Sequence, residues 1–364
     1  MSNVAMQAPQ ERWERIAREV ERSALNAVIV TTPGSIAFAT GIDPRTFIDR
    51  RAAVAVTSDS AVVIAADCDL PAIQTSGFTG TVVTWPRYEG AAGRARALTS
   101  LGLDATTPTQ HGIGAADAEA TAVVARAQRT KSDDDVAALR TAANVTDVAY
   151  TATVDRLHPE LRAYEIVRNV DRSIRAMGDG AAWSLDEADA ALGATTVFPR
   201  EAIVGLLDRV PESGVLDRMH PLPFQLHPLE AGWMGASGTT VVFREPDARL
   251  RSTAASAAEG LRRAIEALSP GTTGAEIHAT FTQHVGGVEG AYLVGFESGM
   301  GPGPLAVGPA CSRPLEDREV LVLRAGAPGA HGAPGVFFQT TVLITPQGSE
   351  RLDTVIPLRL IELY

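Results

Sequence analysis

The second half of the chain repeats one order of secondary-structure elements, and this repeat constrains the fold more than any other feature of the sequence. Apolar periodicity predicts two helices followed by strands, and then the same series again. The predicted segments are a helix that starts at Ser132, a helix at 161–176, a strand-rich block at 213–243, helices at 252–268 and 274–285, and strands at 319–324, 335–344 and 352–357. Two copies of one helix-helix-strand unit predict a single domain built as a pseudo-repeat.

The first part of the chain alternates helices and strands in a different way. The predicted helices are 11–22 and 90–102, and the predicted strands are 24–32, 52–58, 61–66 and 81–85. This alternation predicts a small α/β domain at 1–128, followed by a second domain at 129–364. The stretch 129–132 is the predicted hinge. Ser132 and Asp135 there resemble a capping box, with Asp in place of the usual Glu.

Composition excludes several classes of protein. The chain has 364 residues and a formal net charge of −11, which argues against a nucleic-acid binder because such proteins neutralise phosphates with Lys and Arg. No run of 18 apolar residues occurs, so no membrane span is expected. The first residues lack the apolar core of a signal peptide, and cytoplasmic residence is expected by elimination. Two cysteines, Cys68 and Cys311, form neither a disulfide framework nor a four-thiolate zinc site.

Five stretches, in order, resemble the pita-bread family of methionine aminopeptidase, prolidase, aminopeptidase P and creatinase. They are ALNAVIVTTPGSIAFATGI, RTKSDDDVAALRTAANVTDVAY, GWMGASGTTVVFREPD, AIEALSPGTTGAEIHATF and GVFFQTTVLITPQG. The resemblance implies a mixed α/β (α+β) fold. In that fold a creatinase-type N-terminal domain precedes a pita-bread domain with a pseudo-twofold repeat. It also implies a homodimer.

The resemblance also locates the positions that hold metal in the family. Its metallopeptidases bind two divalent ions with two Asp, one His and two Glu. These positions fall on Gln225, Ala236, Phe296, Arg324 and Gln339. None of the five supplies an anionic ligand, and Arg324 carries a permanent positive charge. At an effective dielectric of about 20, like unit charges about 4 Å apart repel by roughly 4 kcal/mol. The pattern therefore predicts that no metal and no other cofactor is bound.

Creatinase, the member that works without metal, gives the best local match. It also carries an amide and an Ala at the two Asp positions, here Gln225 and Ala236. In creatinase a Phe and an Arg of the N-terminal domain hold the substrate carboxylate of the partner subunit. The segment GIDPRTFIDRR places Phe47 at the Phe position and Arg50 one residue past the Arg position. An Arg fork suits a carboxylate because it donates two parallel hydrogen bonds.

Other creatinase positions are replaced. The catalytic His aligns near Asp208, and the two Glu positions that bind the amidino group fall on Gly238 and Gln339. A guanidinium-type substrate needs anionic acceptors, so creatine itself is not expected to bind. Either Asp208 or His227 is the predicted proton-transfer residue. Asp208 would need burial to raise its pKa, whereas an imidazole ordinarily titrates near neutral pH.

Polar residues on apolar strands complete the predicted site. Arg324 is expected to anchor an anion, and Gln225 and Gln339 to orient the substrate, because the matching family positions face one cavity. The remaining predicted substrate-binding residues, with Phe47 and Arg50, are Trp233, Phe296, Glu297 and His331. His331 lies in the Gly/Pro-rich stretch AGAPGAHGAPG, which is expected to be a surface loop.

These features predict a metal-independent, creatinase-like enzyme that acts on a small carboxylate-bearing, amino-acid-like substrate. The reaction class is C–N hydrolysis, or an acid–base elimination, rearrangement or cyclisation. The alternative is a catalytically inactive pita-bread protein that binds a partner. A third interpretation shifts the alignment and leaves one metal on His220, His227 and Glu230. Their spacing does not place all three side chains on one face of a single strand.

Overall fold

The computed structural model describes residues 9–42, 51–76, 78–158, 160–161, 163–176, 195–197, 221–230, 232–328 and 335–363. The chain divides into two compact units, Met1–Arg129 and Thr130–Tyr364. We call them unit 1 and unit 2 and describe each by itself. Both mix helices and strands, so the predicted α/β class is confirmed.

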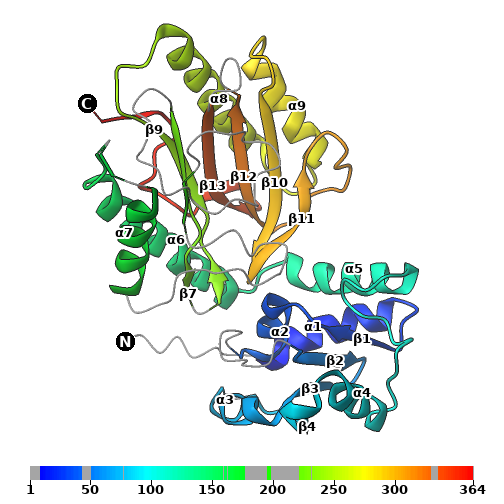
Figure 1. The fold of residues 1–364 in the computed structure, drawn as a ribbon. Coiled ribbons are helices and arrows are strands. Elements are labelled where there is room, and N and C mark those ends of the chain that lie inside the picture. The colour runs from blue at the N-terminus through cyan, green and yellow to red at the C-terminus, as the bar shows by residue number, and fades with distance from the viewer. Residues whose placement is uncertain are drawn as a thin grey trace. The chain divides into compact units, whose positions relative to one another are not determined.

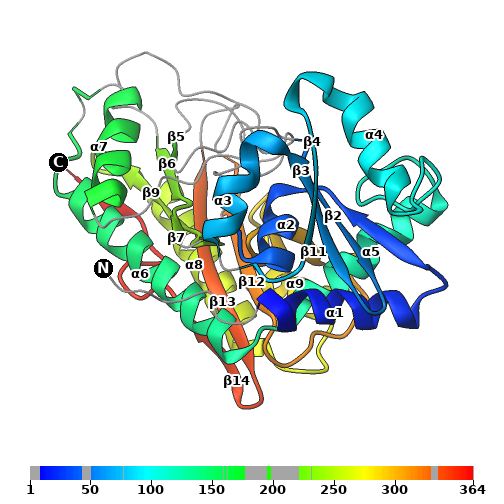
Figure 2. The ribbon, with the colours of Figure 1, turned by 90° about the horizontal axis from the view of Figure 1, so that it is seen from below.

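Unit 1 is a four-stranded sheet with helices on both faces. Its strands are β1 (Ala27–Val30), β2 (Ala53–Thr57), β3 (Ala61–Ala66) and β4 (Thr81–Trp85), in that spatial order. Its helices are α1 (Pro9–Arg22), α2 (Pro33–Thr40), α3 (Leu70–Thr75), α4 (Gly90–Ser100) and α5 (Ala115–Arg129). Short 3-10 segments lie at Asp67–Asp69 and Arg87–Glu89. Helix α4 packs on β3 and β4, and α1 packs on β2, α2 and α5 (Figure 2).

The predicted hairpin over Asp59 and Ser60 is confirmed, but the strand predicted at 24–32 is too long. Thr32 is the N-cap of α2 and accepts a hydrogen bond from the backbone N–H of Ser35. Pro33 follows in the first turn, where its missing N–H costs nothing. The chain therefore turns into a helix directly after β1. The prediction also missed α5, because its many alanines give no sharp apolar stripe.

Unit 2 is built on a nine-stranded sheet and two pairs of helices (Figure 1). The main path runs β11-β10-β12-β13-β9-β6-β5, with β14 beside β13 and β15 beside β9. The strands are β5 (Thr195–Val197), β6 (Leu222–Leu226), β9 (Ser237–Val242), β10 (Tyr292–Gly299), β11 (Gly301–Val307), β12 (Val320–Ala327), β13 (Val336–Thr345), β14 (Gly348–Arg351) and β15 (Ile361–Glu362). A separate two-stranded sheet pairs β7 (Leu229–Glu230) with β8 (Trp233–Met234).

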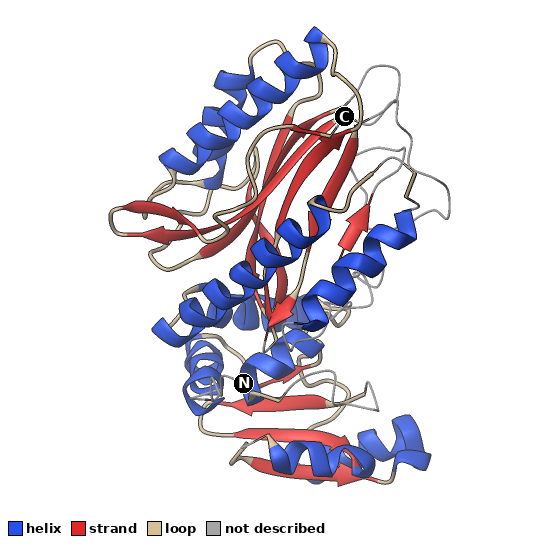
Figure 3. Cartoon of the chain, turned by 90° about the vertical axis from the view of Figure 1, so that its left-hand side faces the viewer, coloured by secondary structure: helices blue, strands red, loops and turns tan. Residues whose placement is uncertain are grey.

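The helices of unit 2 form the two predicted pairs. They are α6 (Asp133–Val154) with α7 (Ala163–Ala176), and α8 (Ala248–Ala267) with α9 (Gly274–Val285). Figure 3 shows these helices flanking the strands of the unit. Each pair covers its own half of the sheet with an apolar cluster. The predicted pseudo-repeat therefore has a physical basis, because each helix pair buries the apolar face of the strands that follow it.

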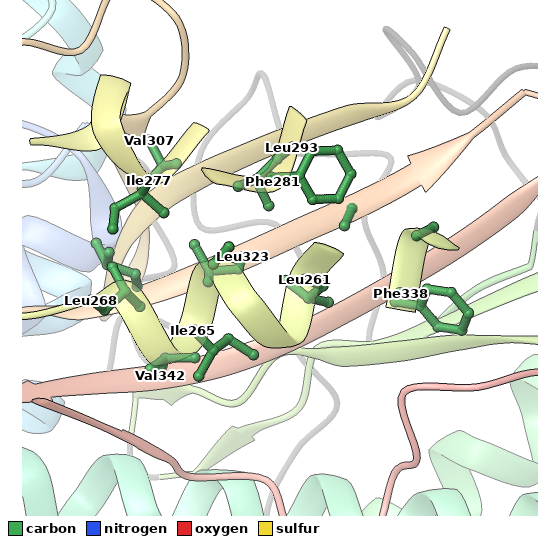
Figure 4. Close-up of a cluster of buried hydrophobic side chains, with 14 of the residues drawn as sticks. Leu261, Ile265, Leu268, Ile277, Phe281, Leu293, Val307, Leu323, Phe338 and Val342 are labelled. Atoms are coloured by element: carbon green, nitrogen blue, oxygen red, sulfur yellow. The ribbon is translucent and has the colours of Figure 1, made fainter. Parts of the chain in front are cut away.

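The larger cluster lies between α8, α9 and strands β10, β12 and β13 (Figure 4). Leu261 and Phe281 from the helices, and Leu323 and Phe338 from the strands, are 0–1% exposed. Gly260 permits the close helix packing, since a Cβ there would lie 2.7 Å from Val285 and 2.9 Å from Phe281. The closely packed helix pair supports the half of the sheet that carries Arg324 and Gln339.

Register assigns the polar residues to the opposite face of the sheet. Residues directly opposed in an antiparallel pair point to the same side. Gln339 is opposed to Arg324 on one neighbouring strand and to Gly238 on the other, and Gly238 is opposed to Gln225. Their chain neighbours Phe338 and Phe224 pack toward the helices. The face opposite the helices, called the inner face below, therefore carries Tyr292, Phe296, Arg324, Gln339, Gln225 and His227.

Two features of unit 2 differ from the predicted series of elements. Gly301–Val307 is not among the predicted strands, but it forms strand β11. Residues 352–357 form no strand, and the chain there instead follows the β13-β14 hairpin and ends in the short β15.

The capping box at the start of α6 gives the first prediction. The Ser132 side chain accepts a hydrogen bond from the Asp135 N–H, and the Asp135 carboxylate accepts one from the Ser132 N–H, as the sequence predicted. Replacing Ser132 with Ala should lower the free energy of unfolding of unit 2 by about 1 kcal/mol. Urea unfolding followed by circular dichroism measures this. Thr151→Ala is the control, because that hydroxyl only bonds back to the Asp147 carbonyl within the same helix. An equal loss in both variants would contradict the capping role.

Candidate functional site

Arg324 and Gln339 form the centre of a polar cluster on the inner face. They are opposed on β12 and β13, and Arg324 Nε donates a hydrogen bond of 2.7 Å to Gln339 Oε1. Gln339 is fully buried and Arg324 is partly exposed. The bond holds the guanidinium in one orientation, so a permanent positive charge is fixed beside the neutral side chain of Gln339.

The cluster continues from Gln339 to His227. Gln339 Nε2 lies 3.2 Å from His227 Nε2, and the imidazole is 2% exposed. Burial and the nearby Arg324 charge lower the pKa of His227 to about 3, although the contact with Gln339 acts in the opposite direction. The imidazole is therefore neutral near pH 7. The expectation that His227 titrates near neutral pH is wrong for this environment.

Phe296 lies against the same guanidinium. Its ring centroid is 5.2 Å from Arg324 Cζ, which is a cation–π contact. Phe296 and Arg324 are on neighbouring strands, with Val294 opposed to Arg324. The structure thus places Phe296, Arg324 and Gln339 on one face, as predicted.

Gly238 explains how the two halves of the sheet meet at the cluster. It is opposed to both Gln225 and Gln339. A Cβ at Gly238 would lie 2.8 Å from the Phe337 ring and 3.0 Å from Gln225 Cβ. The Phe337 ring therefore occupies the space beside the position where creatinase carries a Glu. A side chain at this position would collide with the Phe337 ring and with the Phe224 carbonyl oxygen, which lies 2.9 Å from such a Cβ.

Tyr292 is an inner-face residue that the sequence reasoning missed. It begins β10, and the alternation of that strand places it on the same side as Phe296. Its side chain crosses β12 at Gly326, where a Cβ would lie 2.9 Å from Tyr292 Oη. Burial raises the pKa of this phenol, and the Arg324 charge opposes the rise. The period-two pattern in YLVGF was the signal that would have identified it.

Glu297 does not join this cluster, so its predicted role in substrate binding is wrong. It follows Phe296 in β10 and points to the other face. Its carboxylate is 3.0 Å from Arg313 Nη2, and that guanidinium also bonds to Glu319. Glu297 and Glu319 are 6% and 0% exposed, and the partly exposed Arg313 joins these two buried carboxylates, which ties β10 to the start of β12.

Trp233 is buried at 2% exposure beside the far end of β10. A Cβ at Gly299 would lie 3.8 Å from the Trp233 ring and 3.9 Å from Lys131 Cε. Trp233 thus lies beside Gly299 at the end of β10. Arg324 lies beside Val294, nearer the start of the same strand. Its role in substrate binding stays a prediction.

Four predicted site residues lie outside the described part of the chain. They are Phe47, Arg50, Asp208 and His331. His220 of the shifted-alignment interpretation lies outside it as well. Their roles stay predictions.

The described residues do not fit the two-metal site that the family resemblance implies. Gln339 Oε1 already accepts from Arg324, whose fixed positive charge lies where a carboxylate would be needed. Over the described ranges, no three His, Cys, Asp or Glu side chains gather in a way that would hold a metal ion.

Comparison with known proteins agrees with this architecture. The prolidase of Thermococcus sibiricus superposes with a TM-score of 0.78 at 15% identity, over 98% of this chain and 100% of its own. The prolidase of Pyrococcus horikoshii OT3 gives 0.76 at 16% identity, over 95% and 99%. The N-terminal domain of the FACT complex subunit SPT16 from Cicer arietinum gives 0.72 at 9% identity, over 98% and 99%. At such identities these likenesses show the fold alone.

No curated protein matches the sequence of this chain. Within the described residues, none of the helices combines the length and apolar character needed to cross a membrane. The sequence model of metallopeptidase family M24 matches residues 137–346, which is more than half of the chain. The expected pita-bread family is thereby confirmed, and the chain belongs to metallopeptidase family M24.

Proposed function

We propose that this chain is a metal-independent, creatinase-like enzyme that acts on a small carboxylate-bearing, amino-acid-like substrate. The observation that supports it most is the fixed guanidinium of Arg324, bonded to Gln339 and stacked on Phe296 at a position where the family carries an anionic ligand. A planar guanidinium held in one orientation suits a carboxylate. Because Arg324 is half-buried, its attraction for an anion is stronger than that of a surface arginine.

The proposed chemistry needs only acid–base groups from the protein, and in a hydrolysis water is the nucleophile that attacks as the C–N bond breaks. C–N hydrolysis, elimination, rearrangement and cyclisation all belong to this class. His227 does not serve as the general base in this proposal, since a group with a pKa of about 3 is a very weak base at pH 7. Asp208 is the proposed base. In a homodimer, the partner subunit's Phe47 and Arg50 would complete the binding site.

The second candidate is a binding protein without catalysis. Gln225, His227 and Gln339 are each at most 2% exposed, and a filled site is what this candidate predicts. The partly exposed Arg324 instead supports an enzyme. Turnover of a small carboxylate that is lost with Asp208→Asn would decide for the enzyme. The result that would decide for the binding protein has two parts. Asp208→Asn would bind ligands as tightly as wild type, and wild type would convert no bound ligand to product.

Metal independence gives the second prediction. Protein purified without added metal should contain less than one divalent ion per two chains by elemental analysis. Its ligand-induced rise in melting temperature should persist in EDTA, because Arg324 opposes cation binding. Loss of that rise in EDTA and its recovery with Mn²⁺ or Co²⁺ would contradict the proposal.

The third prediction concerns Arg324 itself. Arg324→Gln should abolish the melting-temperature rise caused by small carboxylates, because a charge-assisted hydrogen bond contributes about 1.5–3 kcal/mol to binding. Thermal-shift titration measures this. Arg140→Gln is the matched control, since it removes an exposed guanidinium that pairs with Glu350. Equal rises in wild type and Arg324→Gln would show that carboxylates bind elsewhere.

The fourth prediction concerns the neutral state of His227. Its pKa in the folded chain, about 3, lies below the ordinary 6.5, so the unfolded chain binds one more proton between these values. Folding stability should therefore fall as the pH falls below about 6.5. Between pH 7.5 and pH 5, wild type should lose about 2 kcal/mol more than His227→Leu, as measured by urea unfolding at both pH values. Parallel losses in the two proteins would mean that His227 is protonated when folded.

A further inference from the structure

Two buried polar atoms on the inner face have no hydrogen-bond partner. They are Tyr292 Oη and His227 Nδ1. Buried polar groups without partners are uncommon in folded proteins, and a ligand, ion or water that completes the bonding is one explanation for them. Both residues lie near Arg324 on the inner face, because Tyr292 is opposed to Gly326 on the Arg324 strand and His227 contacts the Gln339 side chain that accepts from Arg324.

The hydrogen bonds around Gln339 determine which proton His227 carries. The Arg324 guanidinium only donates, so the Gln339 oxygen must face it and the amide nitrogen must face His227. That nitrogen donates, and His227 Nε2 therefore accepts. A neutral imidazole with an accepting Nε2 carries its proton on Nδ1. The unpartnered atom is thus an N–H donor.

Tyr292 presents a second donor. Its phenol stays protonated because burial disfavours the phenolate, and its hydroxyl lies over Gly326. Any side chain at Gly326 would meet this hydroxyl at 2.9 Å and the Val336 carbonyl at 2.3 Å. The glycine is therefore required for the position of the Tyr292 ring.

The strand order places the two donors on either side of Arg324. Tyr292 is on β10, next to the Arg324 strand β12, whereas His227 lies beyond Gln339 of β13. Tyr292 is opposed to Gly326, two residues from Arg324 on the same face. A carboxylate on Arg324 is therefore close to Tyr292, and a second acceptor of the same ligand would reach His227.

We propose that Tyr292 and His227 are ligand-binding donors on either side of Arg324. The ligand is a small carboxylate with a second oxygen acceptor, such as a dicarboxylate or an acylated amino acid. Its carboxylate is shared by Arg324 and the Tyr292 hydroxyl, and its second oxygen accepts from His227 Nδ1–H. This rests on the proposed function, because it assumes that Arg324 binds a carboxylate.

Titration calorimetry on the full chain tests this with acetate, malonate, succinate and N-acetylglycine as probes. Wild type should bind at least one of the probes with two acceptors about 10-fold more tightly than acetate. His227→Leu should remove that preference but leave acetate binding unchanged. Tyr292→Phe should weaken acetate and the larger probes alike, by about 10-fold.

Tyr150→Phe is the matched control, because this buried tyrosine of α6 packs in the apolar cluster on the other face of the sheet. Tyr292→Phe should also leave the melting temperature of the ligand-free protein unchanged or higher, since its hydroxyl has no partner to lose. A tyrosine with a purely structural role would show the reverse pattern, a lower melting temperature and unchanged affinity.

The outcomes separate the two proposals. If wild type binds no probe, the carboxylate function and this inference both fail. If acetate and the larger probes bind equally well, or if Tyr292→Phe binds as tightly as Tyr150→Phe, the inference fails and the carboxylate function stands.

Discussion

The hydrogen bond between Arg324 and Gln339 determines the chemistry of the whole inner face. It fixes a permanent charge among buried strands, and that charge acts on each titratable neighbour. His227 loses its proton and Tyr292 is held by burial in its neutral form, so both present N–H or O–H groups instead of charges. At this strand position the chain therefore carries a fixed cation where the family resemblance implies an anionic ligand.

The scaffold around this face retains what the family fold requires. Two helix pairs bury one side of the sheet, and capping boxes at Ser132 and Thr273 define where α6 and α9 begin. These features depend on apolar periodicity and local hydrogen bonds, and neither depends on a bound metal. Prolidases and an SPT16 domain share this fold with the chain at 9–16% sequence identity.

The sequence was most informative where local rules decide the outcome. The helix pairs, the β2-β3 hairpin and the Ser132 cap follow from periodicity and capping, and Arg324 and Gln339 follow from the family resemblance. The strand β11 was missed because GPGPLAV has turn-forming residues, and only pairing with β10 makes it a strand. Glu297 was misassigned because its partner Arg313 is far from it in the chain. The state of His227 was misjudged because a pKa depends on burial, which no single sequence displays.

The packing around Gly238 limits which substitutions this part of the sheet can accept. A Cβ at position 238 would lie 2.8 Å from the Phe337 ring and 2.9 Å from the Phe224 carbonyl oxygen. A single substitution of Gly238 with Glu would therefore collide with an aromatic ring and with the backbone of the neighbouring strand. Replacing Phe337 with a smaller residue would remove only the first of these collisions, so an acidic group at this position also requires the two strands to move apart.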